Sequence, residues 1–392
     1  MTDVLGLSVD SILADETLRQ RLFPVTAGSV YAAHAAVAPL PGPVAEAMIE
    51  YTQAASGRGQ FEHLHRECES GARRLAAQLM DVDPDEIALA PSTSAGLSTI
   101  AAGLDWQPGD SVVASGGDFP SNVYPWTALR ARGVDARLVP PHPDGILHVE
   151  DVLSLVDAST RVVALSTVHY CTGARLPLDE LAAELRPRGV FFVLDAIQSL
   201  GAVPLSFRAV DAAAADGHKW LLGPQGMGVL YVRRSMWPAL RPALVGWKSV
   251  QDSHAYGSTD GELAHSARRY EPGSLNAVGV VGLHAALRLL TDVGADAVAQ
   301  RLAALRQLLS GELSSRGLTV VGGSADAASP IVAVHGRRPA GDLVRYLDDR
   351  GFIVSLRADP TGRLCIRLSP HFYNTDREMK RLCDCIEEAE GV

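Results

Sequence analysis

Short apolar runs alternate with helical segments through the first 232 residues, and this alternation restricts the chain to few folds. Seven runs have the length and composition of buried strands, at 86–89, 111–114, 136–139, 162–165, 191–194, 212–215 and 228–232. Segments of 10–25 residues with helical periodicity or turn signals separate them. The pattern predicts an α/β fold, in which helices cover both faces of a mostly parallel sheet. In such sheets, ligands bind beyond the carboxyl ends of the strands.

The pattern changes near residue 270. Long helical stretches are predicted at 278–290 and 295–316, and short strands follow at 318–321, 331–334, 352–354 and 364–368. We therefore expect three parts: an N-terminal segment over 1–25 that packs with the small domain, a large domain over 26–270, and a smaller C-terminal α+β domain over 271–392. A helix is expected near 62–80. The polar segment 246–262 is interpreted as a surface loop, with a lid or an intersubunit element as alternatives.

Composition narrows the class of protein. The formal net charge is −10 at pH 7, which argues against a general nucleic-acid binder, because such proteins carry clustered Lys and Arg. The first four residues lack the character of a signal peptide, and no apolar run reaches the ~20 residues of a membrane span. Five scattered cysteines show no metal-like spacing and favour free thiols in a reducing compartment. We expect a cytoplasmic protein without a metal, a nucleic-acid partner or a membrane partner.

Lys219 is the most informative candidate residue. It precedes a glycine-rich turn at 223–228 and the apolar run 228–232, and Asp195 ends another apolar run upstream. A lysine that forms a Schiff base and an aspartate that pairs with a pyridinium nitrogen are the protein groups that pyridoxal 5'-phosphate (PLP) chemistry requires. The pair predicts PLP as the cofactor and an amine or amino acid as the substrate.

A nucleotide-dependent oxidoreductase is an alternative for an α/β chain with glycine-rich turns. That class places GxGxxG after its first strand, with an acidic residue about 20 positions further on. Here the glycines at 223, 226 and 228 come before a strand. The order of glycines and strand therefore disfavours this alternative.

The stretch 56–374 resembles the class V aminotransferase family of fold-type I PLP enzymes, which includes cysteine desulfurases and isopenicillin-N-epimerase-like proteins. The strongest match is the sequence Gly-His-Lys at 217–219, followed by Gly-Pro-Gln-Gly-Met-Gly at 223–228. Further matches occur in the order and at the spacing of the family. The resemblance implies the fold-type I PLP-dependent transferase fold, with a mostly parallel seven-stranded sheet in the large domain.

The resemblance also implies the cofactor contacts. Lys219 would be the Schiff-base lysine, Asp195 would pair with the ring nitrogen, and Gln198 would reach the phenolic oxygen. The segment 90–97 resembles the phosphate loop of the family, and a helix N-terminus suits a phosphate. The contacts expected at the phosphate are Thr93, Ser94 and, next to the lysine, His218.

Four further positions follow from the resemblance. Ser274, within Glu-Pro-Gly-Ser at 271–274, would reach the phosphate in the partner subunit, so the active sites would be shared across a homodimer. Phe119 takes the place of the histidine with which desulfurases stack on the cofactor, and a phenyl ring cannot shuttle protons. Tyr170 stands where many relatives have an asparagine. His169 lies one residue away and points either into the substrate pocket or away from it.

Substrate contacts are expected at the C-terminal end. Arg367 matches the arginine that binds the substrate α-carboxylate in relatives, and a bidentate pair would fix the orientation of an amino acid. Arg357 is a second candidate. The loop predicted at 355–363 lacks the nucleophilic cysteine of desulfurases. Cys365 follows inside an apolar run, which is typical of a core thiol.

These departures argue against persulfide-forming desulfuration and leave three reactions with a common first step. The amino acid replaces Lys219 on the cofactor, and the released amine takes the Cα proton. Our leading hypothesis is β-elimination, with C–S cleavage of a cysteine-derived substrate. An aminotransferase or an amino-acid epimerase is the alternative, and a non-catalytic PLP-fold binding protein is more remote.

Overall fold

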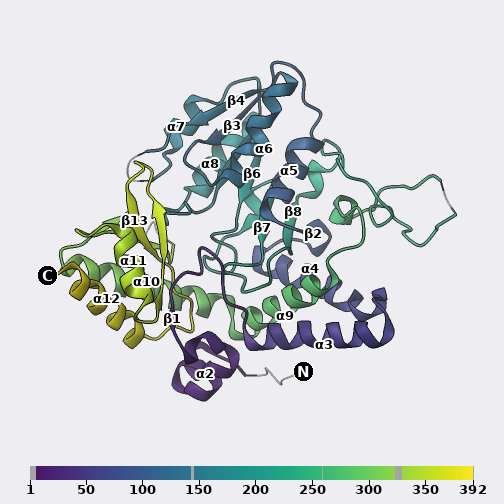
Figure 1. The fold of residues 1–392 in the computed structure, drawn as a ribbon. Coiled ribbons are helices and arrows are strands. Elements are labelled where there is room, and N and C mark those ends of the chain that lie inside the picture. Colours follow the sequence, from purple (N-terminus) through teal and green to yellow (C-terminus); the bar gives the residue numbers. More distant parts are fainter. Residues whose placement is uncertain (1–5, 143–144, 258, 323–328, 392) are drawn as a thin grey trace.

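A seven-stranded sheet forms the centre of the larger part of the molecule (Figure 1). This computed structural model describes residues 6–142, 145–257, 259–322 and 329–391. The strands lie in the order β2-β8-β7-β6-β5-β3-β4, and β8 runs antiparallel to both of its neighbours while the others are parallel to one another. Their bounds are β2 (Ile87–Ala90), β3 (Ser111–Ser115), β4 (Asp135–Val139), β5 (Thr160–Ser166), β6 (Phe191–Asp195), β7 (Ala212–Asp216) and β8 (Gly228–Val232). All seven predicted strands, and the mostly parallel sheet, are confirmed.

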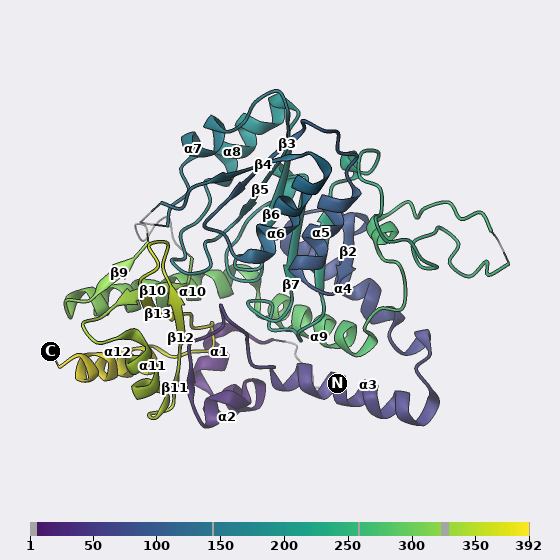
Figure 2. The ribbon, with the colours of Figure 1, turned by 45° about the horizontal axis from the view of Figure 1, so that its top comes forward.

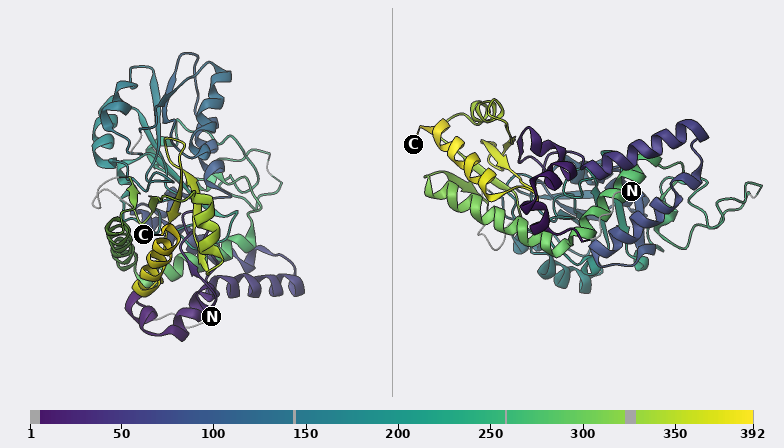
Figure 3. Two further views of the ribbon diagram at one scale, coloured as in Figure 1. Left: turned by 60° about the vertical axis from the view of Figure 1, so that its left-hand side comes forward. Right: turned by 90° about the horizontal axis from the view of Figure 1, so that it is seen from below.

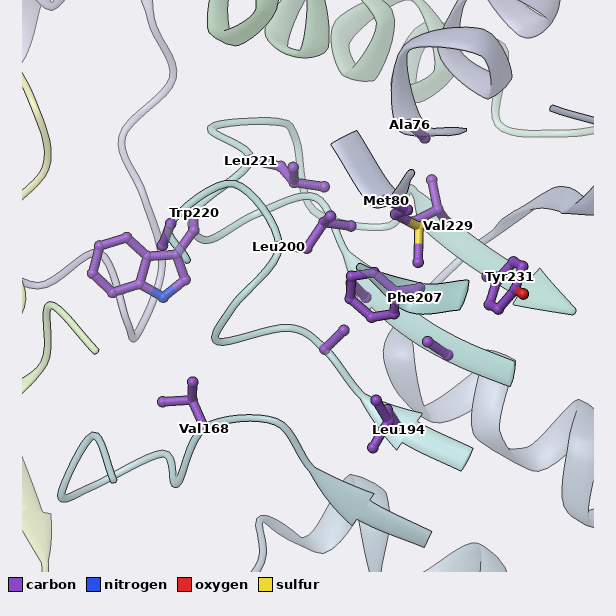
Figure 4. Close-up of a cluster of buried hydrophobic side chains, with 14 of the residues drawn as sticks. Ala76, Met80, Val168, Leu194, Leu200, Phe207, Trp220, Leu221, Val229 and Tyr231 are labelled. Carbon is purple, nitrogen blue, oxygen red and sulfur yellow. The ribbon is translucent and has the colours of Figure 1, made fainter. Parts of the chain in front are cut away.

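Helices cover both faces of this sheet, because successive strand residues point to opposite sides. Val163 and Leu165 of β5 join one buried cluster, whereas Val162 and Ala164 join the other. The first face is covered by α4 (Arg66–Met80), α7 (Val149–Ser154), α8 (Leu178–Leu185) and α9 (Ala277–Val293), and the second by α5 (Thr93–Gly103) and α6 (Tyr124–Thr127). Figure 4 shows part of the first cluster, to which Met80 of α4 and Val229 of β8 both belong. Burial of each such side chain contributes roughly 1.5–3 kcal/mol.

The helix predicted near 62–80 is interrupted. A 3₁₀ turn, η2 (Glu62–Leu64), precedes α4, and His65 separates them with a φ of −134° and a ψ of −3°. The backbone N–H of His65 bonds the carbonyl of Glu62, which closes the turn before α4 begins. The long α3 (Gly42–Arg58) comes before this turn and packs against α9.

The smaller part contains a four-stranded antiparallel sheet in the order β12-β13-β10-β9. Its elements are β9 (Thr319–Val321), β10 (Val332–His335), β12 (Ser355–Ala358), β13 (Leu364–Leu368), α10 (Ala295–Ser315), α11 (Ala340–Asp348) and α12 (Asp376–Glu390). The prediction that 355–363 is a loop is wrong for its first four residues, which pair with β13. A tight turn closes this hairpin, because the Asp359 carboxylate accepts the N–H groups of Thr361 and Arg363.

The N-terminal segment contacts the C-terminal part of the chain. It forms α1 (Val9–Ala14), α2 (Glu16–Leu22), η1 (Pro24–Ala27) and β1 (Val30–Tyr31), and β1 pairs with β11 (Phe352–Ile353). Arg19 donates to Glu378 at 2.8 Å, and Phe23 stacks on Tyr373 at 3.9 Å between ring centroids. Figure 3 shows these helices in purple beside the yellow C-terminal helix. The division at residues 25 and 270 stays a prediction, and α9, beyond that boundary, packs against α3 and α4.

Part of the chain between η8 (Arg234–Met236) and η9 (Ala267–Tyr270) extends away from the rest of the molecule (Figure 2). The roles predicted for 246–262 stay predictions, and residue 258 lies outside the described residues. Within the described part of the chain, no single helix is long and apolar enough to cross a bilayer. The helices α9 and α10 pass such a test only as a pair, with an 80° bend between them.

Candidate active site

One cavity lies beyond the carboxyl ends of β6 and β7, between the large sheet and the β12–β13 hairpin. Ten of the twelve predicted site residues line it: Thr93, Ser94, Phe119, Tyr170, Asp195, Gln198, His218 and Lys219 from the large part, and Arg357 and Arg367 from the hairpin. The strand register explains why Asp195 and Lys219 line the same cavity. Asp195, at the end of β6, lies beside Ala214 of β7, and the segment that carries Lys219 follows β7. Sequence segments more than 250 residues apart therefore contribute to one site.

A tight turn after β7 brings Lys219 to the cavity. A Cβ at Gly217 would lie 2.7 Å from the Met227 carbonyl oxygen, so glycine is required there. Leu222 closes the turn with a φ of +59°, a conformation that is uncommon outside glycine. Burial lowers the pKa of the Lys219 amine to about 8, against the opposing effect of Asp195. Its Nζ lies 5.6 Å from the centre of the Phe119 ring.

Asp195 is almost fully buried and lines the same cavity. Its Oδ1 accepts the backbone N–H of Ile197 at 3.0 Å. Burial raises the pKa of this carboxyl to about 6, although the Ile197 N–H and Lys219 favour the charged form. A cation placed beside Asp195 would compensate for this burial, which is the role predicted for a protonated pyridine nitrogen.

The N-terminus of α5 forms a second wall of the cavity. The Ser92 side chain caps this helix by accepting the N–H of Ala95. Thr93 Oγ1 accepts the backbone N–H of Asp216 at 2.9 Å, and Ser94 Oγ donates to Ser121 Oγ at 2.8 Å. The cradle therefore combines hydroxyl groups with the positive end of an eleven-residue helix, which suits a phosphate.

His218 borders this cradle. Its Nδ1 lies 3.1 Å from Asp216 Oδ1, at the carboxyl end of β7. The contact keeps the imidazole ring at the edge of the cavity, beside Lys219.

Gln198 is held at both ends of its amide. Its Nε2 donates to the Ala35 carbonyl at 3.0 Å, and its Oε1 accepts the indole N–H of Trp220 at 2.9 Å. The Trp220 carbonyl oxygen lies 3.2 Å from Nε2 of His371. Gln198 thus enters the cavity in a fixed orientation, with one amide N–H left for a ligand.

Arg367 is the most unusual group in the site. It is 1% exposed, and its Nη1 donates to the Tyr170 carbonyl at 2.6 Å. Its Nε and Nη2 are buried and have no hydrogen-bond partner among the described residues. Burial and the neighbouring Arg357 lower the pKa of this guanidinium to about 9. These two donors share one edge of the guanidinium, the arrangement that binds a carboxylate through two parallel bonds.

Two predicted residues do not reach this cavity. His169 Nδ1 accepts the N–H groups of Cys171 and Thr172, and its Nε2 lies 3.0 Å from the Gly117 carbonyl oxygen. Both ring nitrogens are therefore engaged, and burial lowers the pKa of His169 to about 4. Ser274 borders a different cavity, and its predicted role depends on a second subunit.

Sequence reasoning missed two neighbours of the site. Ser121 lines the cavity and holds Ser94. Asp118 directly precedes Phe119 in the chain and accepts hydrogen bonds from Asn122 Nδ2 at 2.8 Å and from the Ser166 N–H at 2.9 Å. Burial raises the pKa of Asp118 to about 7, and the charge of Asp195 adds to this shift. The signal for Asp118 was a carboxylate just after β3, at the sheet edge where ligands bind.

The cysteines and possible metal ligands add no further centre within the described residues. Cys365 is fully buried, with its sulfur 3.6 Å from that of Cys171, in agreement with a core thiol. No group of three or more His, Cys, Asp or Glu side chains in the described part of the chain is arranged to hold a metal ion.

Comparison with known proteins agrees with this geometry. The family model "Aminotransferase class-V" matches residues 30–382, and the chain therefore belongs to this family. A probable cysteine desulfurase of Methanothermobacter thermautotrophicus is 29% identical over 95% of this chain and 98% of its own length. The expected assignment is thus confirmed and the chain is cysteine desulfurase-like. The isopenicillin-N-epimerase branch is not specifically indicated.

Solved structures show the same fold. The apo structure of a cysteine desulfurase from Thermococcus onnurineus superimposes with a TM-score of 0.86 at 25% identity, covering 96% of this chain and 98% of that one. The cystine C-S lyase C-DES, in complex with its product cysteine persulfide, gives 0.86 at 26% identity and covers 93% and 99%. A lysine-to-alanine variant of C-DES, with glycine covalently linked to the PLP cofactor, gives 0.87 at 26% identity and covers 94% and 99%.

Proposed function

We propose that this chain binds PLP through Lys219 and uses it to act on an α-amino acid. The observation that carries the proposal is the shared cavity of Lys219, Asp195 and the unpaired edge of Arg367. The residues fit the cofactor, because the α5 cradle suits its phosphate and the buried Asp195 suits a protonated ring nitrogen. The PLP complex of the similar protein C-DES supports the same assignment.

Each residue has a distinct role in this proposal. Bound PLP supplies an electron sink that makes the Cα–H bond of an amino acid acidic. Arg367 binds the α-carboxylate and thereby presents the Cα–H bond to Lys219. The Lys219 amine, with a pKa near 8, is suited to take the proton. Phe119 packs at the cavity mouth and can exchange no proton, so Lys219 is the base.

We propose β-elimination with C–S cleavage as the reaction. Lys219 removes the Cα proton, the Cβ–S bond breaks with its electron pair staying on sulfur, and hydrolysis of the remainder gives pyruvate and ammonia. The hairpin turn at 359–362 contains no cysteine that would accept the sulfur. The C–S lyase activity named for the similar protein C-DES also supports this choice.

The protein is proposed to act as a homodimer with shared active sites. Ser274 lies outside the cavity of its own chain, in a segment whose backbone has positive φ at Gly273 (+137°) and at Ser274 itself (+29°). Large apolar side chains close to this segment are exposed, with Leu244 at 69% and Val245 at 62%. Such a patch is typical of a contact surface. Light scattering at micromolar concentration should give twice the chain mass, and a monomer would contradict this arrangement.

Cofactor attachment can be tested with unusual sharpness, because the chain has only three lysines, Lys219, Lys248 and Lys380. Borohydride reduction of the yellow holoprotein, followed by peptide mass mapping, should place the cofactor on Lys219 alone. Lys248→Ala and Lys380→Ala are the matched controls and should keep the label, whereas Lys219→Ala should lose it. Wild-type protein that never binds PLP would refute the proposed function.

The reaction type needs a separate assay. Cysteine S-conjugates should release pyruvate and a thiol in equal amounts without any added keto acid. Amino exchange that requires a keto acid would instead identify an aminotransferase. Conversion of the amino acid into its opposite stereoisomer, with no pyruvate, thiol or new amino acid formed, would identify an epimerase.

A further inference from the structure

The small-domain wall of the cavity carries two guanidinium groups on one face of a β-hairpin. Arg357 of β12 lies opposite Cys365 of β13, and Arg367 follows two residues later along the same strand. Side chains two residues apart in a strand point to the same face, so the two arginines are diagonal neighbours. Both line the cavity that contains Lys219.

Neither guanidinium has an acidic partner in the described chain. Among the residues that the structure describes, no carboxylate lies within ion-pair distance of Arg357 or Arg367. Asp359, in the turn of the same hairpin, is paired with His335 at 2.8 Å. Asp195 lies across the cavity, where its charge acts on Lys219. Two like charges thus face one cavity without compensation, which is unfavourable unless a ligand supplies negative charge.

The two arginines are anchored separately. Arg367 Nη1 bonds the Tyr170 carbonyl of the large part, and Arg357 Nη1 donates to the Leu356 carbonyl at 2.6 Å on its own strand. Arg367 is 1% exposed and presents a single free edge, which accommodates one carboxylate. Arg357 is only partly buried, and its remaining donors have no partner in the described part of the chain. Arg357 is therefore available to bind a second anionic group independently of Arg367.

We infer that Arg357 determines specificity for an amino acid whose side chain ends in an anionic group, while Arg367 holds its α-carboxylate. This inference rests on the proposed function and names the substrate class for the same site. The cofactor phosphate does not satisfy Arg357 in this arrangement, because its cradle is formed by α5 and His218 in the large part. For a C–S lyase, the class is a cysteine S-conjugate with a carboxylate arm.

Equilibrium binding of matched amino acids tests the inference without relying on turnover. Isothermal titration of the holoprotein compares L-glutamate with L-glutamine and L-aspartate with L-asparagine, which differ in charge but hardly in shape. Wild type should bind each acid roughly tenfold to a hundredfold more tightly than its amide, the usual strength of a charge-assisted bond. Arg357→Met should bring this ratio to about one.

Two further variants separate the explanations. Arg367→Met should weaken the acid and the amide equally, because both have an α-carboxylate. Arg357→Lys should keep a reduced preference, because it retains the charge but loses the planar fork. Equal or absent binding of acid and amide by wild type overturns the inference. The inference is also overturned if Arg357→Met, shown by circular dichroism to be folded, loses the same affinity for the acid and for its amide. In that case both arginines would hold the α-carboxylate.

The two proposals fail in different ways. The proposed function fails when borohydride fixes no cofactor on Lys219. The inference about Arg357 fails when the protein holds the cofactor but does not distinguish an acid from its amide. With cysteine S-conjugates, S-(2-carboxyethyl)cysteine and S-propylcysteine form the corresponding pair for the pyruvate assay.

Discussion

The two walls of the cavity differ in how their polar groups are satisfied. On the large-domain wall, Asp195, Thr93 and Gln198 all have hydrogen-bond partners within the protein. On the hairpin wall, Arg367 buries two donors that have none in the described residues. These three residues of the first wall are held in place before any ligand arrives, whereas Arg367 of the second wall is completed by one. We interpret the large-domain wall as the place where the type of chemistry is set and the hairpin wall as the place where the substrate is chosen.

The largest expected effect concerns Asp195. Asp195→Asn keeps the shape of the side chain but removes the negative charge that would hold a proton on the cofactor ring. We expect kcat to fall roughly 10²–10³-fold, the usual cost of removing a preorganised electrostatic partner. The measurement is steady-state turnover together with the absorbance spectrum of the holoprotein. A loss of kcat below tenfold would mean that the ring nitrogen does not pair with Asp195, and that the large-domain wall does not set the chemistry in this way.

The acidity of Lys219 gives the next largest effect. Because the pKa is lowered from its usual 10.5 to about 8, the neutral amine rises tenfold per pH unit below pH 8 and levels off above it. The rate at which apoprotein takes up PLP should follow this curve between pH 6 and 10. A rate that still climbs tenfold between pH 9 and 10 would mean an ordinary, solvated lysine. Free N-acetyl-lysine amide provides the reference curve.

Replacement of Arg367 should produce opposite effects on binding and stability. Arg367→Met removes a buried charge without a partner, so we expect the free energy of unfolding of the ligand-free protein to rise by about 1–4 kcal/mol. Arg19 is the matched control, since it is also buried but bonds Glu16 and Glu378. Arg19→Met should lower the free energy of unfolding by ~3–5 kcal/mol. Urea unfolding measures both changes in the free energy of unfolding. If the two substitutions changed it in the same direction, Arg367 could not be distinguished from a buried arginine that already has its acidic partners.

The smallest expected effect concerns the large-domain wall, where Gln198 is held by hydrogen bonds within the protein. Trp220→Phe deletes the N–H that binds Gln198 Oε1 and leaves a buried acceptor unpaired, at a cost of about 1–3 kcal/mol. Trp237→Phe removes a similar N–H, bonded to the Val232 carbonyl away from the cavity. Both variants should lose stability, but only Trp220→Phe should also release PLP more readily on dialysis. Equal cofactor retention would mean that Gln198 needs no support.

Local sequence patterns were sufficient to predict much of the fold and of the site. The strands of the large sheet are short apolar runs, and Lys219 and Asp195 directly follow such runs, so their positions could be predicted. The direction of His169 could not, because it depends on the Gly117 carbonyl, which a loop after a different strand brings close. The β12 strand was missed because its polar residues do not face solvent: Ser355 is buried and Arg357 lines the cavity. The free edge of Arg367 is a property of tertiary packing alone.

The scarcity of lysine in this chain has a chemical consequence. Of its 35 basic Lys and Arg residues only three are lysines, and Lys248 is buried in an ion pair with Glu69 at 2.9 Å. Aldehydes condense with amines but not readily with guanidinium groups, which stay protonated. An aldehyde present in excess would therefore find few side-chain amines on this protein to modify by accident. Because Lys380 is exposed, it is the lysine that such a reagent would modify first by accident, and peptide mapping separates this label from one on the buried Lys219.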